Sequence, residues 1–273
     1  MRSPSAPAGD TVERLAEQLH EALEASFRGI FARLEGSRLE ERPGYLFLVC
    51  PLLPLPQLNG VWARGREEQQ QAVRELAGAI AEIEALALPC WVQTRIGRTP
   101  ALEVEARRLG LTSEESIPGM VAVAGDLREV TSPEVEIARI ADAALLAEAQ
   151  AVAAEGFAVP PHLFAPFYTQ TVAATPGLSI YLGRAAGKPV STAISFRQGD
   201  AVGIFNVATP PEHRRRGYGR ALTARAAQDG FEAGAGFAWL QSSPLGESVY
   251  RRMGFQHVET YTLLCRPAND SAH

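Results

Sequence analysis

Lysine, cysteine and long apolar runs are scarce in this sequence. Lys188 is the only lysine among 26 basic residues, so nearly all of the positive charge is carried by arginine. The formal net charge is −5, and an acidic chain has no overall attraction to nucleic acid. We therefore expect no nucleic-acid partner, and we interpret the excess of arginine over lysine as a compositional bias.

The cysteines and the apolar runs exclude further classes of protein. Cys50, Cys90 and Cys265 lie far apart, mostly in apolar segments. This spacing matches neither a metal-binding motif nor a disulfide framework, so buried thiols in a reducing compartment are expected. No apolar run reaches membrane-spanning length, and the N-terminus lacks the apolar core of a signal peptide. These features predict a soluble cytoplasmic protein with no metal site and no membrane partner.

The apolar pattern of the first half predicts alternating helices and strands. Residues 1–9 are expected to form a disordered tail. A helix is expected from Asp10 to about Gly36, because apolar residues recur there at helical spacing. The further elements expected in this half are helices over 66–88 and 101–109 and strands over 45–50, 90–93 and 120–124.

The second half shows the same alternation. Ser132-Pro133-Glu134 has the residue types of a helix N-terminus, and the apolar spacing from Val135 predicts one helix as far as Gly156. Gly187-Lys188-Pro189 separates two apolar runs, which predicts a hairpin. The further elements expected are a strand ending at Val207, strands over 237–241 and 255–264, and helices over 222–232 and 247–253.

The two halves share a short repeated pattern. Trp91-Val92-Gln93 matches Trp239-Leu240-Gln241. The run RRLGL at 107–111 matches RRMGF at 251–255. Helix and strand order is shared as well, which predicts a degenerate duplication. The first copy has ARGRE at 63–67 and nothing like RRRGYGR, so the chemistry is expected in the second half.

The stretch from Ile204 to Arg220, IFNVATPPEHRRRGYGR, carries the main signal for a site. An apolar strand leads through Pro210-Pro211 into three arginines, and Gly217-x-Gly219 opens a helix. A glycine turn at a helix N-terminus directs several unpaired backbone N–H groups to one point, which suits a phosphate or diphosphate. Neither G-x-G-x-x-G nor a GK[ST] loop is present, so dinucleotide and ATP sites are not predicted.

The order of these motifs resembles that of the GNAT superfamily of N-acetyltransferases. Arg214-x-x-Gly217-x-Gly219 fits the family's acyl-CoA loop, R/Q-x-x-G-x-G/A, and the run YRRMGF from Tyr250 fits its Y-x-x-x-G-F element. The resemblance covers residues 127–266. It implies an α/β (α+β) fold with a mixed central sheet flanked by helices. In this interpretation residues 10–126 form a degenerate GNAT-like domain and residues 127–268 form the catalytic domain.

The resemblance also implies which residues bind acetyl-CoA, the expected cosubstrate. Main-chain amides from Arg215 to Arg220 would hold the diphosphate, and Val207 to Thr209 would pair with the pantetheine arm like an added strand. Ser243 stands where many family members have asparagine, a departure that bears on contacts to that arm. The set expected at the cofactor is Val207, Ala208, Thr209, Arg214, Arg215, Arg216, Gly217, Tyr218, Gly219, Arg220 and Ser243.

In that family a neutral amine attacks the thioester directly, within a ternary complex. By resemblance, the Val207 backbone amide would stabilise the oxyanion, and Tyr250 would be the general acid that protonates the leaving thiolate. No carboxylate lies in the strand that ends at Val207, so no general base is assigned. Candidates for that role are Glu155, His162, Glu212 and His213, although a solvated loop residue is the simpler interpretation of each.

The acceptor would be a small-molecule amine or a peptide amine. Phe164, Phe167 and Tyr168 are candidates for lining its cleft, with core packing as the simpler role of each. Two functions stay open: an N-acetyltransferase, and a catalytically weak CoA-binding sensor or scaffold protein. The intact loop and Tyr250 favour the enzyme, whereas the lack of an assigned general base leaves the CoA-binding sensor or scaffold open. The sequence leaves a monomer and a homodimer equally open.

Overall fold

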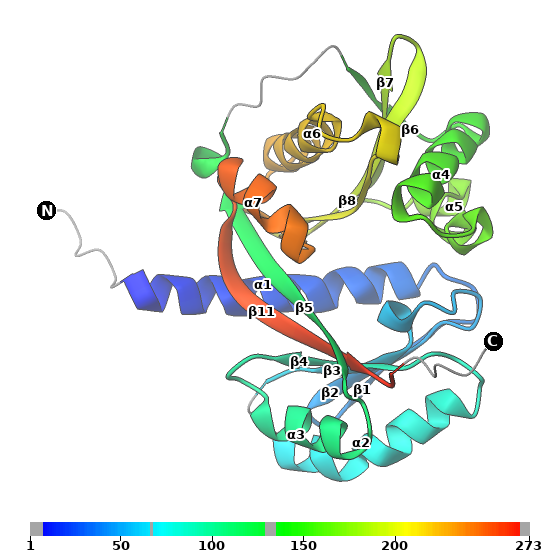
Figure 1. The fold of residues 1–273 in the computed structure, drawn as a ribbon. Helices are drawn as coiled ribbons and strands as arrows, with labels where there is room; N and C mark the ends of the chain where they lie inside the picture. The colour runs from blue at the N-terminus through cyan, green and yellow to red at the C-terminus, as the bar shows by residue number, and fades with distance from the viewer. Residues whose placement is uncertain (1–7, 66–67, 129–134, 268–273) are drawn as a thin grey trace, which may run out of the picture. The chain divides into compact units, whose positions relative to one another are not determined.

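The computed structural model describes residues 8–65, 68–128 and 135–267, which divide into two compact units. Unit 1 contains Met1–Phe27 and Gly119–Val258, and unit 2 contains Arg28–Pro118 and Glu259–His273. In both units helices flank a mixed sheet, as expected (Figure 1). Most of the expected tail lies outside the described residues, which begin at Ala8 with helix α1 (Ala8–Phe31).

The sheet of unit 1 has the strand order β5-β10-β9-β8-β7-β6. Strands β9 and β10 are parallel, and the other neighbours are antiparallel. The β7–β8 hairpin confirms the one predicted at Gly187-Lys188-Pro189. The strands are β5 (Ser113–Val123), β6 (Glu136–Ile140), β7 (Leu178–Ala185), β8 (Lys188–Gln198), β9 (Ala201–Ala208) and β10 (Phe237–Gln241).

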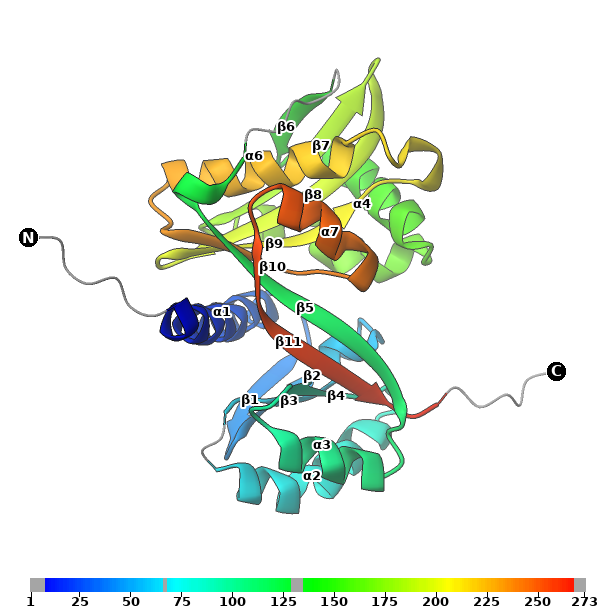
Figure 2. The same cartoon turned by 60° about the vertical axis from the view of Figure 1, so that its left-hand side comes forward.

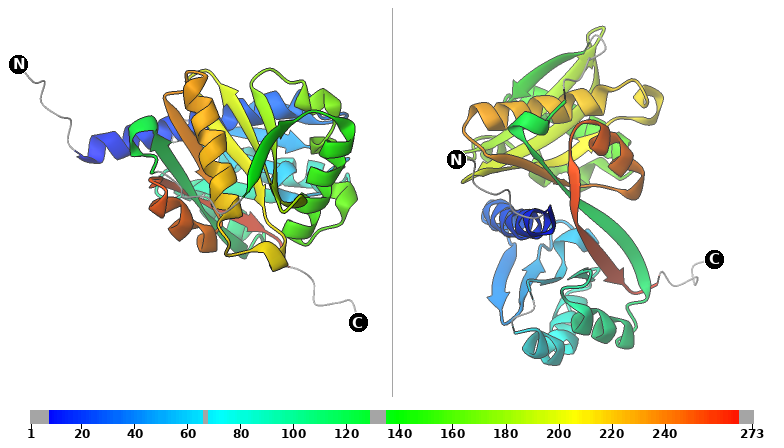
Figure 3. Two further views of the ribbon diagram at one scale, coloured as in Figure 1. Left: turned by 90° about the horizontal axis from the view of Figure 1, so that it is seen from above. Right: turned by 90° about the vertical axis from the view of Figure 1, so that its left-hand side faces the viewer.

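Helices cover both faces of this sheet (Figures 1 and 3). Helix α6 (Tyr218–Glu232) packs on β7, β8 and β9, with Leu222 and Ala226 in a core that includes Val202. Helix α4 (Ala143–Phe157) packs on β8 and β9 from the other side. The remaining helices are α5 (Gln170–Ala173) and α7 (Pro244–Arg252), and α7 follows β10 and carries Tyr250.

The segment from Val135 to Gly156 is not the single helix that its apolar spacing predicts. It forms β6, which pairs with β7, and then α4. The Asp142 carboxylate fixes the start of α4, because it accepts hydrogen bonds from the amides of Ala144 and Leu145 at 2.8 and 3.3 Å. The predicted helix start at Ser132-Pro133-Glu134 lies outside the described residues.

Unit 2 has the strand order β1-β2-β3-β4-β11, in which β3 and β4 are parallel and the other neighbours are antiparallel. Its core joins Phe47 and Val61 of the sheet to Leu76 and Ile80 of one helix. The elements are β1 (Arg38–Arg42), β2 (Tyr45–Val49), β3 (Gly60–Ala63), α2 (Gln69–Glu84), β4 (Trp91–Arg95), α3 (Pro100–Arg108) and β11 (Gln256–Cys265).

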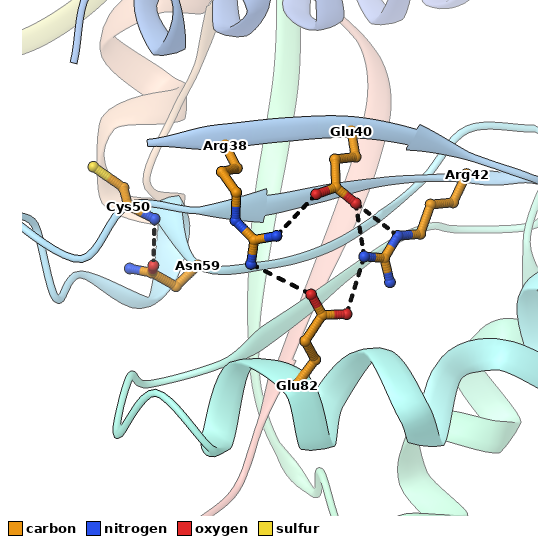
Figure 4. A network of polar contacts seen from close by, with 6 residues as sticks. All are labelled: Arg38, Glu40, Arg42, Cys50, Asn59 and Glu82. Carbon is orange, nitrogen blue, oxygen red and sulfur yellow. Dashed lines mark hydrogen bonds and ion pairs between the residues drawn. The ribbon is translucent and has the colours of Figure 1, made fainter. Parts of the chain in front are cut away.

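Within unit 2, charged side chains connect strand β1 to helix α2 (Figure 4). The Arg42 guanidinium bonds Glu40 at 2.7 Å and Glu82 of α2 at 3.0 Å, and it lies 3.8 Å from the centroid of the Phe47 ring. Arg38 bonds the same two carboxylates. The sequence RLEER shows no apolar alternation, so the apolar pattern does not predict β1. Charges on an edge strand also discourage pairing with another chain.

Asn59, which precedes β3, is a fully buried asparagine. Asn59 Oδ1 accepts a hydrogen bond from the Cys50 amide at 2.7 Å (Figure 4). Asn59 Nδ2 donates to the carbonyl of Leu53 at 2.8 Å. A Cβ on Gly60 would lie 2.1 Å from the Trp91 carbonyl oxygen, so only glycine lets β3 and β4 approach this closely.

The two units share a strand order and exchange a strand. Neighbouring strands are antiparallel, antiparallel, parallel and antiparallel along both β1-β2-β3-β4-β11 and β7-β8-β9-β10-β5. Strand β5 follows α3 in the chain but pairs with β10, and β11 follows α7 but pairs with β4. The units therefore do not coincide with the consecutive segments 10–126 and 127–268. The shared order supports the predicted duplication, whose common origin stays a prediction.

Three expectations drawn from composition concern the cysteines, membrane-spanning segments and metal sites. The three cysteines are free thiols, and burial raises the pKa of Cys90 to about 12. Within the described ranges, no helix combines the length and apolarity that a bilayer crossing requires. The same residues contain no cluster of three or more His, Cys, Asp or Glu side chains able to hold a metal ion.

Candidate functional site

Strands β9 and β10 diverge within unit 1. Their Cα pairing begins at Ala201 with Phe237 and its last pair is Gly203 with Trp239. Strand β9 nevertheless continues to Ala208 and β10 to Gln241. The end of β9 therefore presents backbone groups that β10 does not engage. Figure 2 labels both strands together with α6 and α7, which surround this region.

A bulge at Asn206 reshapes the end of β9. Phe205 pairs with Ile194 of β8 and Ala208 pairs with Thr192, so β9 contains one extra residue between these pairs. Asn206 has φ +49°, a left-handed conformation that asparagine adopts more readily than most residues. The bulge lies directly before Val207, the residue whose amide is expected to stabilise the oxyanion.

A pocket of about 260 Å³ opens at the end of β9. The end of β9, the first turn of α6 and helix α7 all contribute to it. Small residues shape its wall: a Cβ on Gly156 would lie 2.9 Å from Ala208 Cβ, and one on Gly219 would lie 3.4 Å from Thr209 Oγ1. The lining residues are Gly156, Val207, Ala208, Thr209, Arg214, Gly219, Arg220, Gly246, Val249 and Tyr250.

Arg214 organises the loop between β9 and α6. Its Nε donates to the Thr209 carbonyl at 3.1 Å, and its Nη2 donates to the Gly156 carbonyl at 2.7 Å. These bonds connect the loop to the end of β9 and to the last turn of α4. Arg214 therefore has a structural role in addition to the cofactor contact that the sequence motif predicts.

The loop presents backbone amides at the start of α6. Arg215 and Gly217 have φ +62° and +85°, and Gly217 precedes α6 without a side-chain cap. The first amides of a helix have no intrahelical acceptor, so Tyr218, Gly219 and Arg220 present N–H groups at the positive end of the helix dipole. This geometry suits an anionic group.

A second hollow of about 550 Å³ adjoins the pocket and shares Thr209, Arg214, Gly219, Arg220 and Val249 with it. We call it the arginine hollow, because Arg214, Arg215, Arg216, Arg220 and Arg252 line it. In the described part of the chain its lining contains no acidic residue. The sequence did not single out Arg252, since the adjacent Arg251 is the same residue type. Arg251 instead bonds Glu247 at 2.6 Å.

Tyr250 is half-buried in the wall of the pocket. Its ring centroid lies 5.9 Å from that of Phe255, with the planes at 66°. Burial raises the pKa of Tyr250 above its ordinary value and outweighs the lowering effect of the Thr223 hydroxyl. A phenol with a raised pKa keeps its proton at neutral pH. Tyr250 can therefore donate that proton to an atom in the pocket.

Ser243 lines neither the pocket nor the arginine hollow. Its Oγ accepts a hydrogen bond from the Gly246 amide at 3.1 Å and caps the N-terminus of α7. The structure thus gives Ser243 a helix-capping role. Gly246, whose amide it binds, lines the pocket. Its contact with the pantetheine arm stays a prediction.

The sequence offers four candidate general bases: Glu155, His162, Glu212 and His213. In the described chain none of them lines the pocket. Glu155, His162 and Glu212 are exposed, and His213 lines the arginine hollow. The geometry therefore assigns no general base.

Aromatic residues fall into two groups. Phe164 and Tyr168 are buried, and Phe164 stacks on Phe157 at 5.4 Å, so core packing describes them better than a cleft lining. Phe167 is half-buried. A second cluster, which the sequence did not reveal, lies where the strands diverge: the Phe205 ring is edge-on to Trp239 at 5.1 Å and to Phe27 of α1 at 6.4 Å.

Comparisons with known proteins agree with this geometry. Residues 184–258 match the family model described as an acetyltransferase (GNAT) domain. No curated protein matches the chain. A GCN5-related N-acetyltransferase from Kribbella flavida has a similar solved structure, with 22% identity, a TM-score of 0.70 and coverage of 94% of this chain and 97% of that one.

Other solved structures share the fold at lower identity. A GCN5-related N-acetyltransferase from Sphaerobacter thermophilus has 16% identity and a TM-score of 0.60, covering 97% of this chain and 96% of its own. A functionally unknown conserved protein from Staphylococcus epidermidis has 13% identity and a TM-score of 0.63, covering 86% and 96%. The matched segment 184–258 includes β9, the loop and Tyr250, so this part of the chain is similar to a GNAT acetyltransferase domain, and the chain has the GNAT fold of these solved structures.

Proposed function

We propose that this protein is an acyl-CoA-dependent N-acyltransferase, which transfers an acetyl group from acetyl-CoA to a primary amine by direct attack in a ternary complex. The observation that carries the proposal is the divergence of β9 and β10 beyond Gly203 and Trp239, with Val207 and Tyr250 lining one pocket at the end of β9. The GNAT family match supports acetyl transfer from acyl-CoA as the class of reaction.

The cavities fit the parts of the cosubstrate. The pantetheine arm would lie along Val207 to Thr209 and make strand-like hydrogen bonds that β10 leaves open. The diphosphate would meet the amides from Arg215 to Arg220. The wider arginine hollow would hold the nucleotide with its 3′-phosphate, and Arg252 would join the three arginines of the loop there.

The proposed reaction uses one group from β9, the Val207 amide, and one from α7, the Tyr250 hydroxyl. The amine nitrogen attacks the thioester carbon, and the Val207 N–H donates to the oxyanion; one such donor typically contributes ~3 kcal/mol. The carbon–sulfur bond then breaks, and Tyr250 gives its proton to the sulfur. Because a thiol pKa is ~8.5, the thiolate is a modest base and the expected benefit is roughly 10²-fold. The amine loses its proton to water.

Unit 2 would bind no second cosubstrate. The parallel pair β3–β4 has its last Cα pair at Trp62 and Gln93, and the buried Arg95 guanidinium fills the region just after it. Its Nε and Nη2 donate to Glu259 at 3.1 and 2.6 Å, and Nη1 donates to the Arg64 carbonyl at 2.8 Å. One acetyl-CoA per chain is the expected stoichiometry.

An assay of free thiol release from acetyl-CoA, run over a panel of small-molecule and peptide amines, tests the proposal. At least one amine should support turnover, and Tyr250→Phe should lower kcat roughly 10²-fold with an unchanged Kd for acetyl-CoA. Equal rates for the two proteins would remove Tyr250 from its role. Binding of acetyl-CoA without turnover on any amine would favour the CoA-binding sensor. A cytoplasmic location and a monomeric or homodimeric state stay predictions.

A further inference from the structure

Ser191 of β8 and Thr209, directly after β9, form a pair of hydroxyl groups beside the pocket. Ser191 Oγ and Thr209 Oγ1 lie 3.0 Å apart. Ser191 Oγ also donates a hydrogen bond to the Ala208 carbonyl at 2.7 Å. A serine hydroxyl has a single proton, so in its contact with Thr209 it is the acceptor. The Thr209 proton is therefore directed at Ser191, whose side chain is fully buried.

Thr209 lies where the pocket and the arginine hollow meet, because it lines both cavities. Its Oγ1 faces Gly219, which also lines both, since a Cβ on that glycine would lie 3.4 Å from the oxygen. With the proton directed at Ser191, Thr209 Oγ1 offers its lone pairs to a bound molecule. Among the described residues that the two cavities share, Thr209 has the only side-chain oxygen.

The main chain around Thr209 is fixed by its own hydrogen bonds. The Thr209 carbonyl accepts from Arg214 Nε at 3.1 Å, and the Ala208 carbonyl accepts from Ser191. A Cβ on Gly156 would lie 3.1 Å from the Thr209 amide nitrogen, so α4 approaches the chain closely here. Both carbonyls after Val207 thus already accept a hydrogen bond from the protein, whereas the Thr209 hydroxyl donates one and keeps its lone pairs for a ligand.

An oxygen that can only accept distinguishes between the parts of CoA. The diphosphate consists of anionic acceptor oxygens, which gain no hydrogen bond from another acceptor. The pantetheine arm next to it has amide N–H groups and a hydroxyl, and each of these can donate. An acceptor at Thr209 therefore favours the arm at this position and disfavours a phosphate oxygen, which helps to fix the position of CoA along the strand.

We infer that Thr209 Oγ1 accepts a hydrogen bond from an N–H or O–H group of the pantetheine arm, and that Ser191 is the positioning residue that sets the direction of the Thr209 hydroxyl. The inference rests on the proposed function. It adds one side-chain contact to the main-chain contacts proposed for the arm, and it gives a role to Ser191, which lines neither cavity.

Calorimetric titration with two ligands tests the contact: CoA, and 3′-phosphoadenosine 5′-diphosphate, which has the nucleotide and the diphosphate without the arm. Thr209→Val keeps the shape of the side chain and removes its oxygen. It should weaken CoA binding about fivefold and binding of the ligand without the arm less than about twofold, since one neutral hydrogen bond has an effect of this order. Thr209→Ser keeps the hydroxyl and should bind both ligands within about twofold of wild type.

Ser191→Ala tests the positioning role. Without its acceptor, the Thr209 proton can turn into the cavity, where it meets the donors of the arm. We expect CoA binding to weaken about threefold in the wild-type background and not to weaken further in Thr209→Val. Equal losses from Ser191→Ala in the two backgrounds would show a purely structural role and overturn the inference. An equal loss of both ligands in Thr209→Val would overturn it as well.

These affinities are measured without turnover, so the inference and the proposed function can fail separately. A wild type that binds CoA but acetylates no amine would overturn the proposed transferase, and the Kd values would still decide the inference. A wild type that binds neither ligand would overturn both.

Discussion

Gly203 and Trp239 are the last Cα partners between the parallel strands β9 and β10. A Cβ on Gly203 would lie 2.6 Å from Trp239 Cζ2, so the indole occupies the space that a larger residue at 203 would need. Phe205 then lies edge-on to the same indole at 5.1 Å. This packing anchors the two strands at the point where they diverge, and the candidate site depends on that divergence.

The bulge at Asn206 gives a backbone prediction. Asn206→Val should weaken acetyl-CoA binding about tenfold, because a β-branched residue pays ~1–2 kcal/mol in the left-handed conformation and would favour a regular strand. Asn206→Gly should bind within about twofold of wild type, since glycine adopts this conformation freely. Calorimetric titration measures both affinities. Equal affinities for the valine and glycine variants would show that the bulge does not shape the site.

The lining of the arginine hollow predicts that two adjacent arginines, Arg251 and Arg252, contribute differently to CoA binding. Arg252→Gln should weaken CoA binding about fivefold and affect dephospho-CoA much less, because an exposed arginine–phosphate contact is modest in water. Arg251→Gln is the matched control, since Arg251 pairs with Glu247 and does not line the hollow. The comparison uses the ratio of the two Kd values for each protein. An equal loss of CoA and dephospho-CoA binding in Arg252→Gln would place the 3′-phosphate elsewhere.

The charged network on β1 predicts a pH-dependent stability. Desolvation raises the pKa of Glu82, but hydrogen bonds and attraction from Arg42 and Arg38 outweigh it and hold that pKa below its usual value. The resulting stability is present above the pKa of the unfolded state and is lost as pH falls through the lowered pKa of the fold. Glu82→Gln should therefore cost at most about 1 kcal/mol at neutral pH. Urea unfolding should show this difference shrinking in acid, and a constant difference would contradict it.

The buried pair in unit 2 predicts a larger effect. Glu259→Gln removes the carboxylate that both Arg95 and Arg98 bond, with Arg95 almost fully buried. We expect a loss of about 3 kcal/mol in the free energy of unfolding. Glu84→Gln, which breaks the exposed pair with Arg266, should cost less than about 1 kcal/mol. Similar losses for the two variants in urea unfolding would show that burial does not set the strength of these pairs.

The parts of the site that could be predicted are local in sequence. A strand, a glycine turn and a helix start follow one another from Ile204 to Arg220, and their chemistry can be interpreted without knowing the fold. Tyr250 was found through its short motif. The bulge at Asn206 left no stronger signal than one asparagine inside an apolar strand.

The remaining features depend on pairings between distant segments. Strand β5 pairs with β10, and strand β11 pairs with β4. The spacing of apolar residues along the sequence does not indicate these pairings. The segment after Val135 fits helical spacing, but pairing with β7 and the cap at Asp142 decide its structure. Arg251 and Arg252 are the same residue type in sequence, and only their positions on α7 separate an ion pair from a cavity wall.

Calorimetric titration of the full chain with acetyl-CoA tests the central claim most directly. We predict one binding site per chain, with binding lost in Gly219→Val, whose added atoms would crowd Val207 and Thr209 at the pocket wall. Gly78→Ala in α2, where a Cβ meets no atom within 4 Å, should bind like wild type. Absence of binding by the wild type at acetyl-CoA well above micromolar concentration, or unchanged binding by Gly219→Val, would contradict the account.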